Sequence, residues 1–331
     1  MNDSPAAPPR IADVAALAGV SVSTASKALN DTGQLREDTR ARVKEAASRL
    51  GFVPGASGRG RADARTYTVG LLTTDSFGRF TIPLLRGVED ALAAGRMAII
   101  LCDTRDDPLR EHHYLASLQE RRVDGLILTG RTTDPRPSVG LALPTVYAFS
   151  PSQEDADVSV VSDEAAGATM VAEHLLAMGA RRIAHITGPQ RHHSAAVRAA
   201  ATEAVLGEAL VTPPLFGHWS EEWGRSAVDM LLAGGTEPDG LCCGSDQIAR
   251  GAVDRLREHG LDVPTQVRVT GFDNWEVMAL ASRPPLTTVD MGLTALGRLA
   301  GRTLLDLVEG EGAPPRRQVV APRLEVRGSS V

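Results

Sequence analysis

The chemistry-bearing side chains nearest the start of the chain lie in the eight residues VSTASKAL at 22–29. Ala25 and Ala28 recur at helical spacing, so one face of this segment is predicted to be buried. The opposite face carries small hydroxyl groups, one cation and one branched apolar side chain: Val22, Ser23 and Lys27, with Thr24 and Ser26 at its edges. These groups can form hydrogen bonds, but the segment holds no catalytic group. It therefore predicts molecular recognition rather than catalysis.

The rest of the chain offers no catalytic constellation either. Two adjacent histidines stand in RHHS at 191–194, but neighbouring residues cannot share one face of a helix, and no H-x-x-x-H spacing accompanies them. No G-x-S-x-G, P-loop or G-x-G-x-x-G sequence follows a predicted strand. Cys102, Cys242 and Cys243 are irregularly spaced, which favours buried reduced thiols over disulfides or zinc ligands. We therefore predict that the protein is not an enzyme and uses no cofactor or metal ion.

Three short helices are predicted to position residues 22–29. Residues 11–18 form the first helix, which ends at Gly19 because glycine readily takes the left-handed conformation. Ser21 is a suitable N-cap for the second helix. A third helix has apolar residues at i, i+3, i+4 and i+7: Val43, Ala46, Ala47 and Leu50. This arrangement predicts a helix-turn-helix, whose second helix is narrow enough for the major groove of DNA, the alternative being an Ala-rich hairpin used only for packing.

The charge of the chain is unevenly distributed. The net charge is −6, yet residues 1–65 carry ten basic and seven acidic side chains, whereas the remaining 266 carry 25 basic and 34 acidic ones. A basic N-terminal part (residues 1–65) on an acidic remainder (the body) indicates that the N-terminal part alone binds a polyanion. A basic run can also be a solvated helix face. No signal peptide and no apolar run long enough for a membrane span is evident, so we expect a soluble, cytoplasmic protein.

From Tyr67 onward, apolar runs typical of strands alternate with helical segments in two series. This alternation predicts an α/β fold with two doubly wound parallel-sheet lobes, preceded by the small all-α helix-turn-helix domain. Ligands of such sheets bind beyond the carboxyl ends of the strands, so the two lobes are expected to share one cleft. The expected bounds are 1–54 for the head, 55–65 for a hinge linker, 66–161 with 289–318 for lobe 1, and 162–288 with 319–331 for lobe 2, with crossings near Ser162, Thr288 and Val319.

The residues of the head resemble the DNA-binding head of the LacI/GalR family of transcription regulators. The resemblance covers residues 10–328, where the body is similar to the effector domain of that family and to periplasmic sugar-binding proteins. It rests on these segments: IADVAALAGVSVSTASKALN, REDTRARVKEAASRLGFVPG, VGLLTTDSFGRFTIPLLRGVEDAL, DEAAGATMVAEHLLAMGARRIAHITGP, VRVTGFDN and PPLTTVDMGLTALGRLAGRTLLDLVEG.

The resemblance assigns roles to the polar residues of the head. Val22, Ser23 and Lys27 occupy the positions that contact base edges, where Lys27 can donate to guanine and Val22 can contact a thymine methyl group. The positions expected at the DNA backbone, which fix register rather than sequence, are Thr24, Ser26, Asn30 and Arg40.

The segment PGASGRGRADAR departs from the family pattern, in which an Ala-rich hinge folds on DNA and inserts a leucine into the minor groove. Gly55, Gly58 and Gly60 each disfavour a helix by about 1 kcal/mol relative to alanine. Arg61 stands where the leucine would be, and Arg59 lies close to it. Our hypothesis is that both arginines enter a narrow minor groove as charges, the alternative being a plain flexible linker.

The resemblance also implies a set of effector-binding residues at the interlobe cleft: Asp75, Phe80, Asp103, Arg198, Trp219, Asp246 and Asp273. Carboxylates and an arginine can hold vicinal hydroxyl groups, and a tryptophan can stack on the apolar face of a sugar. Taken singly, these side chains could equally be loop caps, rim residues or solvated charges. Thr81 replaces a common second aromatic residue, and Asp290 and Met291 replace residues that are often polar or basic, so the ligand class stays open.

Together these features predict a transcription regulator, most simply a repressor of sugar-catabolic or transport genes. One recognition helix contacts few base pairs, so a homodimer on a pseudo-palindromic double-stranded DNA operator is expected. A small-molecule effector, expected to be a sugar, would act as inducer or co-repressor. The alternative is a soluble cytoplasmic sugar-binding or sugar-processing protein with an incidental helical head.

Overall fold

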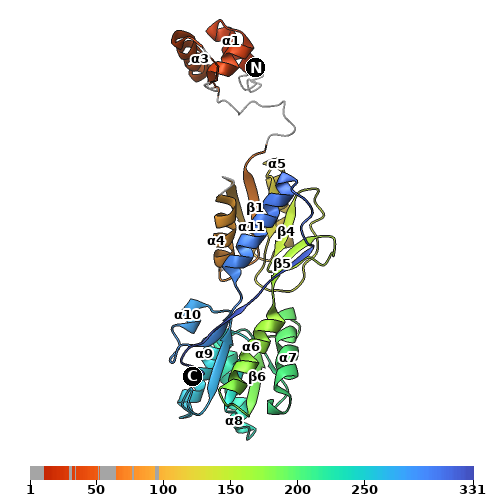
Figure 1. The fold of residues 1–331 in the computed structure, drawn as a ribbon, viewed down its shortest axis with the longest axis vertical. Helices are drawn as coiled ribbons and strands as arrows, with labels where there is room; N and C mark the ends of the chain where they lie inside the picture. Colours follow the sequence, from red (N-terminus) through yellow and green to blue (C-terminus); the bar gives the residue numbers. More distant parts are fainter. Residues whose placement is uncertain are drawn as a thin grey trace, which may run out of the picture. The chain divides into compact units, whose positions relative to one another are not determined.

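The computed structural model describes residues 11–29, 32–33, 35–50, 52, 65–76, 78–93 and 97–331. The chain divides into two compact units, Met1–Ala64 and Arg65–Val331, which we call unit 1 and unit 2. Figure 1 shows the elements of each unit.

Unit 1 contains three helices, α1 (Ile11–Ala18), α2 (Val22–Leu29) and α3 (Glu37–Leu50). Gly19 has a φ of +65°, and Ser21 Oγ accepts a hydrogen bond of 3.1 Å from Thr24 N, so both predicted helix boundaries are confirmed. The helices meet through small buried side chains: Val14, Ala15, Ala18, Ala25, Ala28, Val43, Ala46 and Ala47. Because these side chains are short, the helices approach closely and α2 keeps one face exposed.

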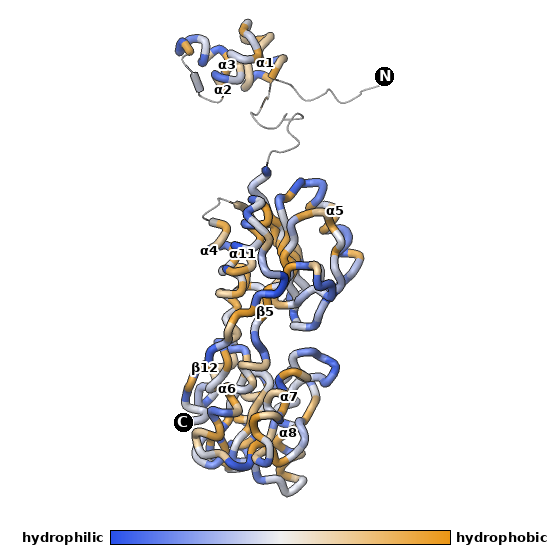
Figure 2. The backbone as a smooth tube through the Cα atoms, turned by 45° about the vertical axis from the view of Figure 1, so that its right-hand side comes forward, coloured by the Kyte–Doolittle hydropathy of each residue, from blue (hydrophilic) through white to orange (hydrophobic). Residues whose placement is uncertain are grey.

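Unit 2 contains two sheets of six strands, and the predicted α/β fold is confirmed. Lobe 1 has the strand order β11-β5-β4-β3-β1-β2, with all of its strand pairs parallel. Its elements are β1 (Thr68–Thr73), α4 (Thr81–Ala93), β2 (Ala98–Asp103), α5 (Pro108–Glu120), β3 (Gly125–Leu128), β4 (Thr145–Ala148), β5 (Val158–Ser162), α11 (Leu293–Glu309) and β11 (Arg317–Val320). In Figure 2 the hydrophobic stretches concentrate within each lobe and the hydrophilic ones in its outer loops.

Lobe 2 has the strand order β12-β10-β9-β8-β6-β7, and only the β10–β12 pair of its strands is antiparallel. Its strands are β6 (Ile183–Thr187), β7 (Leu215–Phe216), β8 (Gly240–Cys243), β9 (Arg268–Phe272), β10 (Thr287–Asp290) and β12 (Arg323–Glu325). Its helices are α6 (Glu164–Ala177), α7 (His193–Leu206), α8 (Glu221–Ala233), α9 (Asp246–Glu258) and α10 (Glu276–Ala279), with a 3-10 turn at Gly207–Ala209.

The chain passes between the two lobes three times, after β5, β10 and β11. The first crossing follows Ser162, as the sequence predicts. The second and third follow Asp290 and Val320, slightly later than expected, because β10 and β11 continue past Thr288 and Val319.

One predicted strand is much shorter than its apolar pattern indicates. Residues 210–216, LVTPPLF, form a strand only at Leu215–Phe216. Leu210 makes no more than an isolated bridge with Ile183. Pro213 and Pro214 lack the backbone N–H that a sheet ladder requires, so the two prolines interrupt the strand.

No helix in the part of the chain that the structure describes is long and apolar enough to cross a membrane. Cys102, Cys242 and Cys243 are free and buried, as the sequence predicts. Burial raises the pKa of Cys242 to about 12, so this thiol stays protonated and inert.

Glycines let α4 and α11 touch backbone to backbone. A Cβ atom on Gly87 would lie 2.0 Å from the carbonyl oxygen of Thr294, and one on Gly297 would lie 2.0 Å from that of Leu84. A side chain at either position would push the two helices apart, because packed interiors have no room for an added methyl group.

Replacing Gly87 by alanine is therefore expected to destabilise the protein by roughly 1–3 kcal/mol, despite the better helix propensity of alanine. The matched control is Arg86→Ala on the preceding, exposed position of α4. Urea unfolding would measure both variants. Equal stability of the two variants would show that the close approach of α4 and α11 is unimportant.

Candidate functional site

The face of α2 that the sequence predicts for recognition is exposed. Val22 has 49% of its surface exposed, and Ser23 and Lys27 are also exposed, whereas Ala25 and Ala28 are fully buried. The Lys27 side chain lies against the backbone of the turn that follows, since a Cβ atom on Gly33 would come within 3.3 Å of its Cδ.

The positions expected at the DNA backbone are partly described by the structure. Thr24 and Ser26 on α2 and Arg40 on α3 are half-buried. Asn30, Arg59 and Arg61 lie outside the described residues. The assignment of individual contacts to bases and phosphates therefore stays a prediction.

The predicted effector residues of unit 2 follow the carboxyl ends of strands, but two of them use their carboxylates within the fold. Asp75 Oδ2 accepts hydrogen bonds from Phe80 N (2.8 Å) and Thr81 N (3.0 Å), so it caps the start of α4. Asp246 accepts from Thr288 Oγ1 (2.5 Å) and Trp275 N (2.6 Å) and is fully buried. These bonds position the loops around the cleft.

Arg198 is the centre of a buried polar network in lobe 2. Its Nε donates to Glu164 Oε2 (2.8 Å) and its Nη1 to the carbonyl oxygen of Gly244 (2.5 Å), while Asp273 Oδ1 lies 3.6 Å from the same Nη1. Its guanidinium carbon lies 3.7 Å from the centre of the Phe272 ring. Burial works to lower the pKa of Arg198, but the charges of Glu164 and Asp273 outweigh it and raise the pKa, so the side chain stays cationic.

The aromatic and remaining acidic residues of the predicted set are divided between the lobes, and of these Trp219 lies against Arg198. The rings of Phe80 and Phe149 are stacked with their centres 4.8 Å apart. Trp219 Nε1 donates to His192 Nδ1 over 2.9 Å, and the ring lies 5.8 Å from the Arg198 guanidinium carbon. Asp103 accepts from Ser76 Oγ and Arg105 N, and its side chain is 34% exposed.

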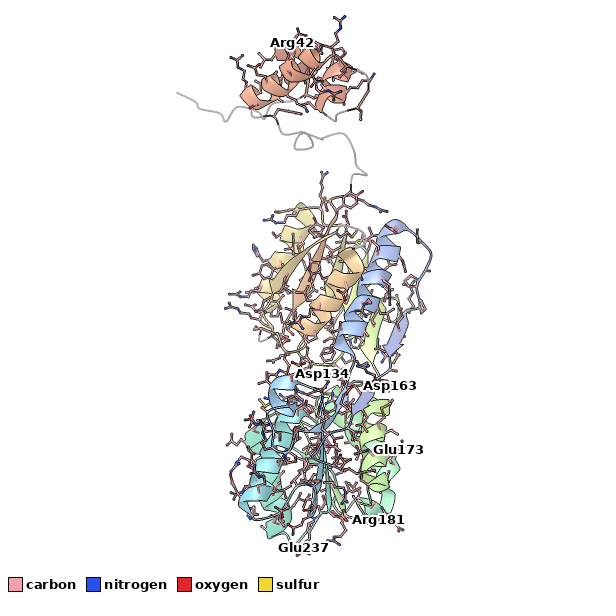
Figure 3. The ribbon with its side chains drawn as sticks, turned by 60° about the vertical axis from the view of Figure 1, so that its left-hand side comes forward. Arg42, Asp134, Asp163, Glu173, Arg181 and Glu237 are labelled. Atoms are coloured by element: carbon pink, nitrogen blue, oxygen red, sulfur yellow. The ribbon has the colours of Figure 1, made fainter. Side chains whose placement is uncertain are left out.

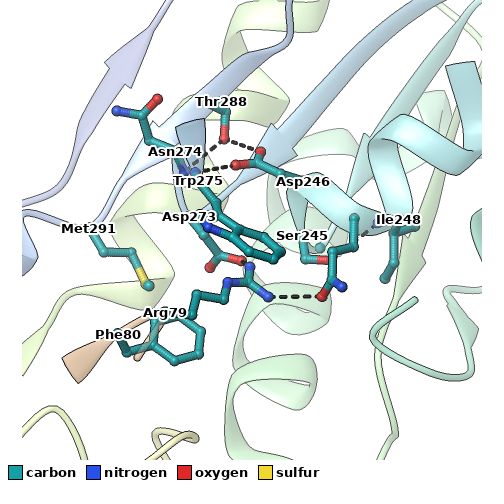
Figure 4. Close-up of polar contacts among 12 residues, drawn as sticks. Arg79, Phe80, Ser245, Asp246, Ile248, Asp273, Asn274, Trp275, Thr288 and Met291 are labelled. Atoms are coloured by element: carbon teal, nitrogen blue, oxygen red, sulfur yellow. Dashed lines mark hydrogen bonds and ion pairs between the residues drawn. The ribbon is translucent and has the colours of Figure 1, made fainter. Parts of the chain in front are cut away.

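Arg79, which was not among the predicted site residues, extends from lobe 1 into lobe 2. Its Nη2 donates to Asp273 Oδ2 and its Nη1 to Gln247 Oε1 (2.9 Å). Its guanidinium carbon lies 4.8 Å from the centre of the Phe80 ring and 4.6 Å from that of the Trp275 ring. Figure 4 shows Arg79 beside both rings and bonded to lobe 2. Its place in the sequence, in the loop after the first strand and next to Phe80, is the signal that could have indicated it.

A second contact joins the lobes at another point. Asp134, in the loop after β3, accepts a hydrogen bond of 2.6 Å from the backbone N–H of His193 at the start of α7. A carboxylate at a helix N-terminus is favoured by the helix dipole. Figure 3 shows Asp134 at the level where the two lobes meet. The lobes therefore contact each other through Asp134 as well as through Arg79.

A cavity of about 770 Å³ lies between the lobes. Phe80 and Asp273 line it together with Arg79 and Trp275, while the other five predicted effector residues are not among its lining residues. Several buried polar atoms near the carboxyl ends of strands have no hydrogen-bond partner, including Glu164 Oε1, Thr187 Oγ1 and Thr129 Oγ1. Buried polar atoms are normally bonded, so these are positions that a hydroxyl-bearing ligand can satisfy. Among the described residues no cluster of potential metal ligands is present.

The chain matches two family models. Residues 10–55 match the bacterial regulatory proteins of the lacI family, and residues 172–330 match a periplasmic binding protein-like domain. It is 31% identical to the ribose operon repressor of Escherichia coli (strain K12) over 327 residues, which cover 96% of this chain and 98% of that protein. The chain belongs to the lacI family. This lacI-family chain is also 31% identical to the transcriptional repressor PurR of Aliivibrio fischeri (strain ATCC 700601 / ES114), over 96% of its own length and 97% of that protein.

Solved structures share the fold of this lacI-family chain. A complex of the transcriptional regulator CelR with cellobiose has a TM-score of 0.69 and 29% identity, covering 97% of this chain and 100% of that one. The Lac repressor dimer bound to operator and the anti-inducer ONPF has a TM-score of 0.78 and 24% identity, covering 98% and 100%. The protein is thus a DNA-binding transcriptional regulator with a ligand-responsive body, as its sequence predicts, and its homologues are regulators rather than enzymes.

The acidic pair at the cleft makes stability depend on pH. Burial, reinforced by the negative charge of Asp273, raises the pKa of Asp246 to about 7, compared with about 4 in an unfolded chain. Between these values the native state holds a proton that the unfolded chain has released. The stabilising contribution of Asp246 is therefore full below about pH 4 and is lost as the pH rises to about 7.

Replacing Asp246 by asparagine is expected to remove its share of this dependence, roughly 1 kcal/mol per pH unit at most, while the raised pKa of Asp273 leaves the rest. Urea unfolding between about pH 4 and 7 would compare it with the wild type and with Asp254→Asn on the same helix. The Asp254 variant should keep the wild-type slope. An unchanged slope in the Asp246 variant would contradict the raised pKa.

Proposed function

We propose that this lacI-family regulator is a repressor that binds a pseudo-palindromic operator as a homodimer and responds to a sugar bound between the lobes of unit 2. The observation that carries the proposal is the pairing of an exposed recognition face on α2 with an interlobe cleft that is rich in hydrogen-bonding groups.

The composition of the α2 face supports DNA reading. Lys27 is a donor suited to guanine O6 and N7, Val22 is an apolar contact suited to a thymine methyl group, and Ser23 can serve either. We assign phosphate contacts to Thr24, Ser26, Asn30 and Arg40 because hydroxyl, amide and guanidinium groups commonly bind phosphate oxygens. We assign contacts in the minor groove of DNA to Arg59 and Arg61.

The cleft supports a sugar as effector. The names of relatives mention ribose and cellobiose, which are neutral polyols. We assign direct ligand contacts to Phe80, Arg198, Trp219 and Asp273, with Asp103 at the rim. Asp75 and Asp246 are positioning residues, because their carboxylates hold the loops that carry these side chains.

Exposed apolar side chains on unit 2 support a homodimer. Ile82 on α4 is 45% exposed and Val277 on α10 is 60% exposed, and both line the 770 Å³ cavity. In Figure 1 α4 and α10 lie on the same side of the two lobes. Exposed apolar side chains on two neighbouring elements are typical of a surface that a second subunit covers.

The DNA assignment is tested by Lys27→Ala and Arg40→Ala. Lys27→Ala should cost about 1–3 kcal/mol and relax specificity at one base pair of each half-site, whereas Arg40→Ala should weaken binding to all sequences alike. An operator would first be selected from a palindromic library, and fluorescence anisotropy at two salt concentrations would then measure single-base variants. Identical behaviour of the two proteins would refute the division into reading and anchoring residues.

The dimer is tested by Ile82→Asp and Val277→Asp. The wild type should sediment at about twice the chain mass of 35.0 kDa, and either charge should shift it toward the monomer because an unpaired carboxylate would be buried in the interface. The control is Leu109→Asp on α5, where an apolar side chain is 82% exposed. A dimer that survives both substitutions would place the interface elsewhere.

A further inference from the structure

The backbone of Arg79 lies in lobe 1, but its side chain contacts lobe 2. It precedes α4, yet both of its hydrogen-bond acceptors, on Asp273 and Gln247, lie in lobe 2, as does the Trp275 ring. Only 14% of its side chain is exposed. A charge-assisted hydrogen bond in this partly buried place is stronger than one in open solvent, so separating the lobes would lose the Arg79–Asp273 bond and return both charges to water.

The position of Arg79 is also the position that a ligand needs. Its guanidinium lies over the Phe80 ring from lobe 1 and the Trp275 ring from lobe 2, and it is bonded to the carboxylate of Asp273 (Figure 4). Flat apolar faces and a carboxylate are the groups that recognise a sugar ring and its hydroxyls. A ligand that uses these groups must therefore move Arg79 aside.

When the Arg79 side chain is displaced, the charges that remain determine whether a charged or an uncharged ligand can bind in its place. Arg198 is already bonded to Glu164 Oε2. With Arg79 displaced, the single cation Arg198 would face the two carboxylates of Glu164 and Asp273. A second carboxylate or a phosphate at this place would meet like charge, whereas hydroxyl groups can donate to Asp273 and to the unpartnered Oε1 of Glu164.

We propose that Arg79 is a specificity-determining latch, which joins the two lobes through Asp273 and which an uncharged, hydroxyl-bearing effector displaces from that carboxylate. This inference rests on the proposed function only in placing the effector between the lobes. It adds that sugar phosphates and sugar acids are rejected. Part of the free energy of effector binding is then used to break the bond between Arg79 and Asp273, which lowers the observed affinity.

The first test needs no ligand. Hydrogen–deuterium exchange of the full-length protein would compare the wild type with Arg79→Ala and with the control Arg302→Ala, which removes an exposed arginine from α11, outside the lining of the cavity. The readout is the backbone amide of His193, which is bonded to Asp134 across the cleft and is remote in sequence from both substitutions. Faster exchange at His193 in Arg79→Ala alone supports the latch. Unchanged exchange there would overturn it.

The second test uses named probes: D-ribose, D-glucose and cellobiose, each beside its charged counterpart, ribose 5-phosphate, glucose 6-phosphate and cellobionate. Calorimetry should show wild-type binding only among the neutral members. Arg79→Ala should bind the same sugar about tenfold more tightly, the factor expected if about one tenth of the wild type is unlatched. Binding of a charged member that disappears in Arg79→Ala would overturn the inference, since Arg79 would then be an anion receptor.

The two tests separate the latch from the proposed function. A wild-type protein that binds no operator would contradict the repressor assignment, yet His193 exchange would still decide whether Arg79 joins the lobes. Conversely, a protein that represses normally but shows the same sugar affinity in Arg79→Ala and Arg302→Ala would retain its function and lose the latch.

Discussion

The carboxylate of Asp273 lies between guanidinium groups from both lobes, Arg79 from lobe 1 and Arg198 from lobe 2. Its backbone has a φ of +104° and that of Asn274 a φ of +51°, conformations that cost non-glycine residues of the order of 1–3 kcal/mol each. Hydrogen bonds from Asp273 N to Val289 O and from Asn274 N to Thr288 Oγ1 hold this turn in place. The strained turn thus places a buried anion where neither lobe can move without changing its electrostatic partners.

Small residues make this arrangement possible in both units. In unit 1, alanines at the helix contacts leave α2 free to present its polar face. In unit 2, α8 and α9 approach so closely that a Cβ atom on Gly224 would lie 2.1 Å from the carbonyl oxygen of Ile248. Tight helix pairs make each lobe a stiff body, so relative motion is confined to the three connections between the lobes.

The spacing of apolar residues and the glycine and capping residues at helix ends predicted the helices and strands well. They predicted the side-chain contacts less well. Gly19 and Ser21 set helix boundaries through local backbone chemistry, which depends only on neighbouring residues. The order of strands likewise placed Asp246 and Asp273 at one edge of a sheet. Which of the two faces inward to hold a loop and which contacts the other lobe depends on long-range packing. Arg79 was missed for the same reason, because no local pattern separates a loop arginine that crosses a cleft from a solvated one.

The interlobe charges also constrain how a ligand can control DNA binding. A ligand shifts an equilibrium only by the difference in its affinity for the two states, so tight binding alone transmits nothing. In this protein Arg79 and Asp134 join the two lobes. An effector that replaces Arg79 exchanges one interlobe contact for another. Whether operator affinity changes then depends on whether the contacts of the effector hold the lobes in the same relative orientation. Because linkage is reciprocal, an operator that prefers the latched arrangement must weaken effector binding by the same factor that the effector weakens operator binding.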